Sequence, residues 1–320
     1  MLPNRAEIED AAALIGRTLK PTAEIVWPLL SARAGREVWV KHENHTPIGA
    51  FKVRGGLVYM DALKRRDPDC PGVVTATRGN HGQSIAFAAR AAGIAATVVV
   101  PLGNSVEKNR AMRAYGAELV EHGHDFTAAY AHALALADER ALHLVPSFDP
   151  LLIRGVATYS YELMSTAPDL DTVYVPIGLG SGISGMIAAR DALGRRCDIV
   201  GVVAERAAAY ALSFKAGRAV ATNSADTLAD GMAVREPNAE AVAIIRAGAA
   251  RVVTVTDDEI LAAMSHYFSD THNIAEGAGA APLAALLKER DAMRGRKVGL
   301  VLSGGNLDRA LYLRALGAAE

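Results

Sequence analysis

Hydrophobic positions fall into short runs that alternate with longer, alanine-rich stretches. The β-branched or apolar runs GVVTAT, IAATVVV, AELVEH and LHLV are typical of buried strands. Between them, HGQSIAFAARAA, SVEKNRAMRAY and DFTAAYAHALALADER have helical spacing, and Gly93 and Gly116 end the first two as C-cap glycines would. This alternation predicts a compact α/β unit over roughly residues 70 to 148.

A second alternating series follows this unit. Its expected strands are TVYVPI, CDIVGVVA, ARVVTV and KVGLVL. The segment up to about Asp61 contains one expected strand, EVWVKHEN, which we assign to the second sheet. Helices are expected to begin near Ser184, Ala207, Asp257, Gly279 and Asn306.

The two series predict an α/β fold with two parallel-sheet domains. We expect a large domain over residues 1–67 and 149–320 and a small domain over residues 68–148, with a cleft between them. Ligands of open parallel sheets bind outside the carboxyl ends of strands. The loops after TVYVPI, GVVTAT and KVGLVL are therefore where we expect the chemistry.

Composition narrows the class of function. The 320 residues include 34 basic and 35 acidic side chains. The net charge of -1 therefore lacks the excess of positive charge that typically binds nucleic acid or an anionic membrane. Cys70 and Cys197 are too few for a disulfide framework or a CxxC metal site. The start MLPNRAEIED lacks the apolar run of a signal peptide, and IAATVVVPL is too short to cross a bilayer. We expect a cytoplasmic protein that binds a small molecule and neither nucleic acid nor membrane.

The densest glycine cluster is PIGLGSGISG, which follows an expected strand and precedes an expected helix. Gly178, Gly180, Gly182 and Gly185 would let backbone amides close on a phosphate at the helix start. The cluster also contains GxGxxG, and Glu205 ends the next strand where a ribose-binding acid would lie, so a nicotinamide dehydrogenase is a rival interpretation. A plain strand-to-helix turn would need fewer glycines.

Lys52 lies in ENHTPIGAFKVRGG, between a glycine-containing turn and an expected helix. An amine near a helix start, beside Phe51, can have a lowered pKa and attack an aldehyde. Taken alone, however, a lysine is far more often a solvated surface charge.

Two further motifs follow strands. In TRGNHGQS, Thr77, Asn80, His81 and the amide of Gly79 could bind a carboxylate at a helix start, and Asn80 could bond a ring hydroxyl. A helix N-cap with a surface histidine is the alternative. In SGGNLD, Ser303 ends KVGLVL and two glycines lead to the next helix.

Together these motifs resemble the fold-type II pyridoxal-phosphate enzymes of the threonine and serine dehydratase group. EVWVKHENHTPIGAFKVRGG is similar to the family's strand and lysine loop, TRGNHGQ to its asparagine loop, GLGSG to its phosphate loop and SGGN to its serine loop. The four motifs stand in the family's order over nearly the whole chain. The resemblance implies a tryptophan synthase β-like fold, with pyridoxal 5'-phosphate in the interdomain cleft, and a homodimer.

The resemblance also implies a role for individual residues. Lys52 would be the catalytic residue and carry the cofactor as a Schiff base, Asn80 would bond its phenolic oxygen, and Ser303 would meet its ring nitrogen. Glu276, in NIAEGAGAAPLAAL, would lie near the ring. The remaining cofactor-binding residues would be Phe51, Gly178, Leu179, Gly180, Ser181 and Gly182. Thr77, Gly79 and His81 are the expected binding residues for the substrate α-carboxylate, because amides at a helix start suit an anion, and Arg78 is a further substrate-binding candidate.

Several positions depart from the family's pattern. Ala50 replaces the serine usual before the Phe-Lys pair, and Gly277 replaces the proline usual after Glu276. Arg78 stands where related racemases have a serine that acts as acid or base, which an always-protonated guanidinium cannot easily replace. Arg78 is instead a candidate for bidentate contact with a distal substrate carboxylate. Glu205 lies where several relatives begin a divalent-cation site, but the expected downstream acid is missing.

The implied activity is β-elimination, in which Lys52 is the base for the Cα proton. L-Threonine would yield 2-oxobutanoate and ammonia, and L-serine would yield pyruvate and ammonia. The alternatives are a 3-hydroxyaspartate or aryl-serine dehydratase, an amino-acid racemase and a non-catalytic pyridoxal-phosphate-binding protein. A dehydrogenase would use the glycine loop alone and leave Lys52 without a role.

Overall fold

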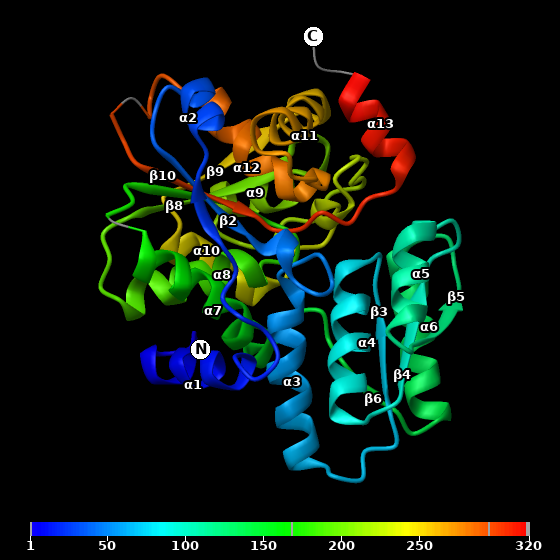
Figure 1. Cartoon of the computed structure of the whole chain (residues 1–320). Helices are drawn as coiled ribbons and strands as arrows, with labels where there is room; N and C mark the ends of the chain where they lie inside the picture. The colour runs from blue at the N-terminus through cyan, green and yellow to red at the C-terminus, as the bar shows by residue number, and fades with distance from the viewer. Residues whose placement is uncertain (1, 168, 294, 318–320) are drawn as a thin grey trace.

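The chain forms two β-sheets covered by helices (Figure 1). The computed structural model describes residues 2–167, 169–293 and 295–317. Within these residues the larger sheet comprises β1 (Glu24–Val26), β2 (Val38–His42), β7 (Thr172–Pro176), β8 (Asp198–Ala204), β9 (Arg251–Val255) and β10 (Val298–Leu302). In space their order is β1-β2-β10-β7-β8-β9, and every neighbouring pair is parallel except β1 and β2.

The smaller sheet lies to one side of the larger one in Figure 1, together with its own helices. All of its strands are parallel, in the order β5-β4-β3-β6, and each of the expected runs supplies one strand. These are β3 (Val73–Ala76), β4 (Ala96–Val100), β5 (Glu118–Glu121) and β6 (His143–Leu144). The helices are α4 (Asn80–Ala92), α5 (Val106–Ala114) and α6 (Phe126–Glu139).

Among the described residues, helices and three short 3-10 turns surround the larger sheet. The helices are α1 (Arg5–Ile15), α2 (Pro28–Ala34), α3 (Lys52–Arg66), α7 (Pro150–Thr166), α8 (Ser181–Ala192), α9 (Ala209–Ala216), α10 (Ala239–Gly248), α11 (Asp257–Thr271), α12 (Gly277–Lys288) and α13 (Arg309–Gly317). The turns are η1 (Glu43–His45), η2 (Glu205–Ala207) and η3 (Asp230–Met232).

Alternate residues of the central strands belong to two different hydrophobic clusters. Tyr174 of β7 packs with α11 and α12, whereas Val173 and Val175 pack with α7, α8 and α10. Because the side chains of a strand alternate between the two faces of a sheet, helices cover both faces here. Burial on both faces explains why runs such as KVGLVL are apolar throughout rather than alternating.

The sequence prediction was wrong at several elements. The N-terminal segment contains two strands rather than one, because three-residue β1 pairs antiparallel with β2, Glu24 opposite Lys41. The prediction also missed α1, α2, α7 and α10. Three of these helices begin after an N-cap residue that the sequence shows. The side chains of Asn4, Asp149 and Asn238 accept hydrogen bonds from backbone N–H groups at the starts of α1, α7 and α10.

The two sheets meet along α3, which packs against both α4 and α7. A Cβ at Gly56 would lie 2.9 Å from the carbonyl oxygen of Ser84 in α4, and one at Gly55 would lie 2.9 Å from that of Leu152 in α7. The glycines therefore allow close helix contacts on both sides. We propose that the chain divides into a large domain, residues 1–67 and 149–320, and a small domain, residues 68–148. In the described part of the chain, no helix has the length and apolar character needed to span a membrane.

Candidate functional site

Lys52 is the first residue of α3, and its amine faces the start of another helix. Its Nζ donates a hydrogen bond to Ser181 Oγ at 3.1 Å and lies 5.2 Å from the centre of the Phe51 ring. Burial lowers the pKa of Lys52 to about 8. The amine is therefore uncharged, and able to act as a nucleophile, at much lower pH than an ordinary lysine.

The segment before Lys52 is held against the loop that follows β10. Phe51 N donates to the carbonyl oxygen of Ser303 at 3.0 Å, and Gly305 N donates to that of Gly49 at 2.9 Å. Ala50 and Gly304 form an antiparallel bridge. Ser303, itself buried, thus lies next to the lysine loop although the two are about 250 positions apart in the sequence.

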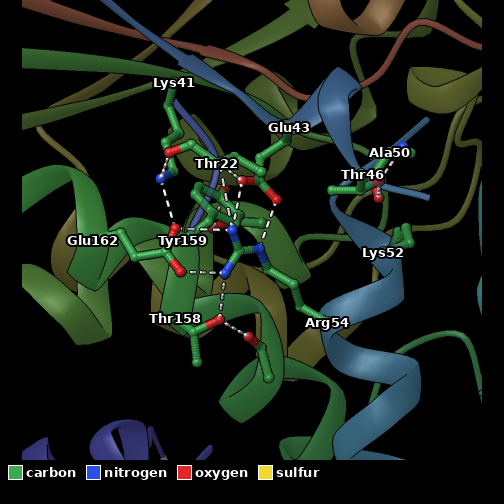
Figure 2. Close-up of polar contacts among 12 residues, drawn as sticks. Thr22, Lys41, Glu43, Thr46, Ala50, Lys52, Arg54, Thr158, Tyr159 and Glu162 are labelled. Atoms are coloured by element: carbon green, nitrogen blue, oxygen red, sulfur yellow. Dashed lines mark hydrogen bonds and ion pairs between the residues drawn. The ribbon is translucent and has the colours of Figure 1, made fainter. Parts of the chain in front are cut away.

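Buried ion pairs anchor the first turn of α3 from the other side (Figure 2). Arg54 binds Glu43 through two hydrogen bonds of 2.7 and 2.9 Å and binds Glu162 through two of 2.6 and 2.9 Å. Lys41 adds a further ion pair to Glu162 at 2.6 Å. In Figure 2 the guanidinium of Arg54 and the side chain of Lys52 lie on opposite sides of the helix. The network fixes the turn that carries the amine without using the amine itself.

The glycine loop connects β7 to α8 and is shaped for a close approach of backbone to ligand. Gly180 has a φ of +102°, which favours glycine, and a Cβ at Gly178 would collide with the carbonyl oxygen of Gly231. Tyr210 holds the loop by donating its hydroxyl to the carbonyl oxygen of Leu179 at 2.8 Å.

This loop fits a phosphate. The first turn of α8 leaves backbone N–H groups without intrahelical partners. Ser184, which is fully buried one turn into the helix, has a hydroxyl with no hydrogen-bond partner among the described residues. A Cβ at Gly182 would approach the Phe51 ring at 3.6 Å, so the loop also borders the lysine segment.

The asparagine loop opens α4. Thr77 Oγ1 accepts from the backbone N–H groups of Gly79 at 2.9 Å and Gly82 at 3.2 Å, which holds the turn before the helix. Asn80 donates its Nδ2 to Glu276 Oε1 at 2.7 Å, and its Oδ1 accepts from Asn306 Nδ2 at 2.8 Å. Both ends of the amide are thus oriented, and one Nδ2 hydrogen remains for a ligand oxygen.

The other expected substrate-binding side chains occupy two different environments. His81 is buried, with Nε2 3.1 Å from Thr75 Oγ1. The Thr75 hydroxyl donates to the carbonyl oxygen of Val145, so Nε2 of His81 carries the hydrogen. Burial lowers the pKa of His81 to about 3, so the ring is neutral. Arg78 is exposed, and no other described residue pairs with its guanidinium.

Glu276, directly before α12, is the buried acid of the site. Burial raises its pKa to about 7, an effect that Lys108 opposes. Lys108 Nζ lies 2.5 Å from Asp230 Oδ2 and 3.6 Å from Glu276 Oε2. Sequence reasoning missed Lys108 and Asp230, because a lysine in the first turn of a helix and an acid in a loop are usually solvated. It also missed the role of Asn306, although that residue completes the SGGN motif.

Glu205 stands apart from these contacts. It is exposed at the start of η2. Among the described residues, no group of three or more His, Cys, Asp or Glu side chains is placed to hold a metal ion. A cation at Glu205 would need backbone carbonyls and water as its other ligands.

Comparisons with known proteins agree on one family. Residues 16–304 match the family model described as pyridoxal-phosphate dependent enzyme. The chain is 37% identical over 302 residues to the L-threonine ammonia-lyase of Geobacter sulfurreducens, covering 94% of this chain and 75% of that protein. It is 30% identical over 321 residues to the L-threo-3-hydroxyaspartate ammonia-lyase of Saccharomyces cerevisiae, covering 100% and 98%. The structure superposes on processed threonine deaminase isoform 2 of Solanum lycopersicum with a TM-score of 0.89 and 29% identity, covering 99% and 95%.

Proposed function

The chain belongs to the family of pyridoxal-phosphate dependent enzymes, and we propose that it removes ammonia from a β-hydroxy amino acid by β-elimination. L-Threonine is a proposed substrate because the relatives include an L-threonine ammonia-lyase and a threonine deaminase. L-Serine is proposed because the motifs resemble those of the threonine and serine dehydratase group. The observation that carries the proposal is the Lys52 amine, which has a lowered pKa and is hydrogen-bonded to the start of the glycine-cradled helix. The alternative of a nicotinamide dehydrogenase rested on the glycine loop alone, and the family match does not support it.

The residues described above fit pyridoxal 5'-phosphate. Lys52 would hold its aldehyde carbon, and the loop from Gly178 to Gly182 would hold its phosphate, with the unpartnered Ser184 hydroxyl nearby. Asn80 would bond the phenolic oxygen through its remaining Nδ2 hydrogen. Ser303 would meet the ring nitrogen. Phe51, Leu179, Ser181 and Glu276 complete the proposed set.

Bound pyridoxal phosphate supplies an aldehyde that captures the substrate amine and a ring that withdraws electrons from Cα. Lys52 then accepts the Cα proton at Nζ, a step its lowered pKa favours near neutral pH. Ser181 orients Nζ, and the helix-start amides after Thr77 bind the α-carboxylate. Overall, L-threonine yields 2-oxobutanoate and ammonium without any oxidant or reductant.

The proposal is tested on purified enzyme incubated with pyridoxal phosphate. The visible absorption spectrum is recorded first, and 2-oxo acid is then assayed with L-threonine and L-serine. A cofactor band with 2-oxo acid formation supports the dehydratase. A band without 2-oxo acid rejects it in favour of racemisation, another β-substituted substrate or a non-catalytic binding role. The absence of any band rejects cofactor binding itself.

The lowered pKa of Lys52 predicts the pH dependence of cofactor uptake. Because only the neutral amine attacks an aldehyde, we expect the uptake rate of cofactor-stripped protein to rise with pH and reach half its maximum at about pH 8. Stopped-flow absorbance between pH 6 and pH 10 measures it. A midpoint at about pH 10, the ordinary lysine value, would contradict the effect of burial.

A second candidate substrate is 3-hydroxyaspartate, favoured by the exposed guanidinium of Arg78, which lies in the asparagine loop and pairs with no other described residue. We expect Arg78→Ala to lower kcat/KM for L-threo-3-hydroxyaspartate by about tenfold or more, the size of a lost charge-assisted hydrogen bond, and to change that for L-threonine by less than about threefold. Arg90→Ala, at the far end of α4, is the control. Unchanged kinetics on both substrates would remove Arg78 from the substrate site.

Three further features belong to the proposal. We propose a homodimer, which the resemblance to the family implies, and a cytoplasmic location, which is compatible with two free cysteines. A divalent cation at Glu205 would depend on carbonyl and water ligands, as described above.

A further inference from the structure

Lys108 lies in the candidate site, between a helix of the smaller sheet and segments next to the larger sheet. It belongs to α5, beside the smaller sheet, whereas its partners Asp230 and Glu276 lie in η3 and before α12, on the larger sheet. Only 4% of Lys108 is exposed. A lysine is rarely buried unless it is paired. Burying this ammonium costs desolvation free energy, which its interactions with the two acids offset.

The aliphatic part of Lys108 packs on the asparagine loop. A Cβ at Gly79 would lie 2.5 Å from Lys108 Cδ and 3.4 Å from Nζ, so the stem fills the space that this glycine leaves. Gly79 is the N-cap of α4 and directly precedes Asn80. Lys108 therefore supports the backbone that is proposed to bind the substrate carboxylate.

The ammonium of Lys108 acts on Glu276. One carboxylate oxygen of Glu276 accepts from Asn80, while the other, Oε2, is buried without a hydrogen-bond partner among the described residues. That oxygen faces Lys108. The charged groups around Glu276 are Lys108 from α5 and Asp230 from η3, and Asp308, which precedes α13, acts on Lys108 in turn. The polar neighbours are Asn80 and the backbone of Gly304.

We propose that Lys108 and Asp230 are positioning residues that set the charge which Glu276 presents to Asn80, and that Lys108 also holds the Gly79–Asn80 turn in place. The inference rests on the proposed function, because Asn80 is the residue assigned to the phenolic oxygen of the cofactor. Glu276 thereby holds or releases a proton next to the group that orients the ring. The two flanking charges act in opposite directions: Lys108 favours the carboxylate, and Asp230 favours the protonated acid.

Contacts other than those of Lys108 also hold α5 in place. Ser105, which caps that helix, donates to Asp308 at 2.6 Å, and Arg309 N donates to Glu107 at 3.1 Å. These contacts join α5 to the segment before α13 without touching Glu276. Removing the Lys108 charge should consequently change the electrostatics of the site more than the position of the helix.

The test is a titration of the Glu276 carboxyl in the holoenzyme by ¹³C NMR of labelled glutamate, with the signal assigned from Glu276→Gln. The wild-type signal is expected to titrate near pH 7. Lys108→Met, which keeps the stem and removes the charge, should move the midpoint up by about one pH unit, and Asp230→Asn should move it down by a similar amount. Lys108→Arg should restore a midpoint close to that of the wild type.

The acid limb of kcat/KM for L-threonine should move in parallel with these midpoints. A wild-type carboxyl that titrates near pH 4 would overturn the inference, as would folded Lys108→Met and Asp230→Asn proteins whose midpoints are unchanged or move in the same direction. If Lys108→Met does not fold, the downward shift in Asp230→Asn still decides the question. If the Glu276 midpoint moves in opposite directions in the two variants but the protein forms no 2-oxo acid, the proposed function is rejected. The effect of Lys108 and Asp230 on the charge of Glu276 would still stand.

Discussion

Replacing Lys52 with alanine is expected to lower 2-oxo acid formation from L-threonine by at least about 10³-fold, because one amine is assigned both the covalent hold on the cofactor and the proton transfer at Cα. The visible band of the resting enzyme should disappear with it. The variant should still fold, because two other sets of contacts hold the turn that carries Lys52. These are the hydrogen bond from Phe51 N to the carbonyl oxygen of Ser303 and the ion pairs of Arg54. A coupled assay for 2-oxo acid and a circular dichroism spectrum measure the two effects.

Lys215→Ala is the matched control, because this lysine is exposed near the end of α9. It should leave both the band and the rate unchanged. If the Lys52→Ala protein kept more than about a tenth of the wild-type rate, another base would have to take the Cα proton, and the central role of Lys52 would fall.

Much of the candidate site could be predicted because its residues follow strands. Gly180 needs a positive φ and Gly178 a close backbone contact, so glycine itself signals the conformation of the glycine loop. The strand runs could also be recognised, since strands buried on both faces are continuously apolar. The roles of Lys52, Asn80 and Ser303 came from resemblance, because propensity and spacing alone left Lys52 as an ordinary surface charge.

Other parts depend on contacts between distant segments, for which a single sequence has no local signal. Asn306 bridges the carbonyl oxygen of Ile48 and the side chain of Asn80, across more than 200 positions in each case. Lys108 meets Asp230 only because α5 faces η3 once both sheets have formed. Strand β1 has three residues, too few to show an alternation, and its pairing with β2 is what makes it a strand.

The ion-pair network around Arg54 also has no local signal in the sequence, because it joins residues of three separate elements. Glu43 lies in η1, whereas Thr158 and Glu162 lie in α7, and Lys41 of β2 shares Glu162 (Figure 2). Such a network contributes little net stability relative to an apolar replacement of the whole set, but breaking it leaves buried charges uncompensated.

Arg54→Met is therefore expected to lower the free energy of unfolding by about 3–5 kcal/mol, measured by urea denaturation of the holoenzyme. Among the described residues, buried Glu43 would then keep only the hydrogen bond donated by Thr22, whereas Glu162 would retain its ion pair with Lys41. Arg65→Ala, an exposed residue of the same helix that pairs with Asp61, should cost less than about 1 kcal/mol.

The pair Arg54→Met and Glu43→Gln separates charge from packing. If the cost of Arg54→Met arises from the unpaired carboxylate of Glu43, adding Glu43→Gln should recover part of the lost stability, because an amide is far cheaper to bury than a charge. Additive losses would instead assign the cost to lost packing around the guanidinium. Because Lys52 lies two residues before Arg54 on the same turn, the recovered stability should be accompanied by recovery of cofactor affinity, which ties the buried ion pairs to the position of the amine.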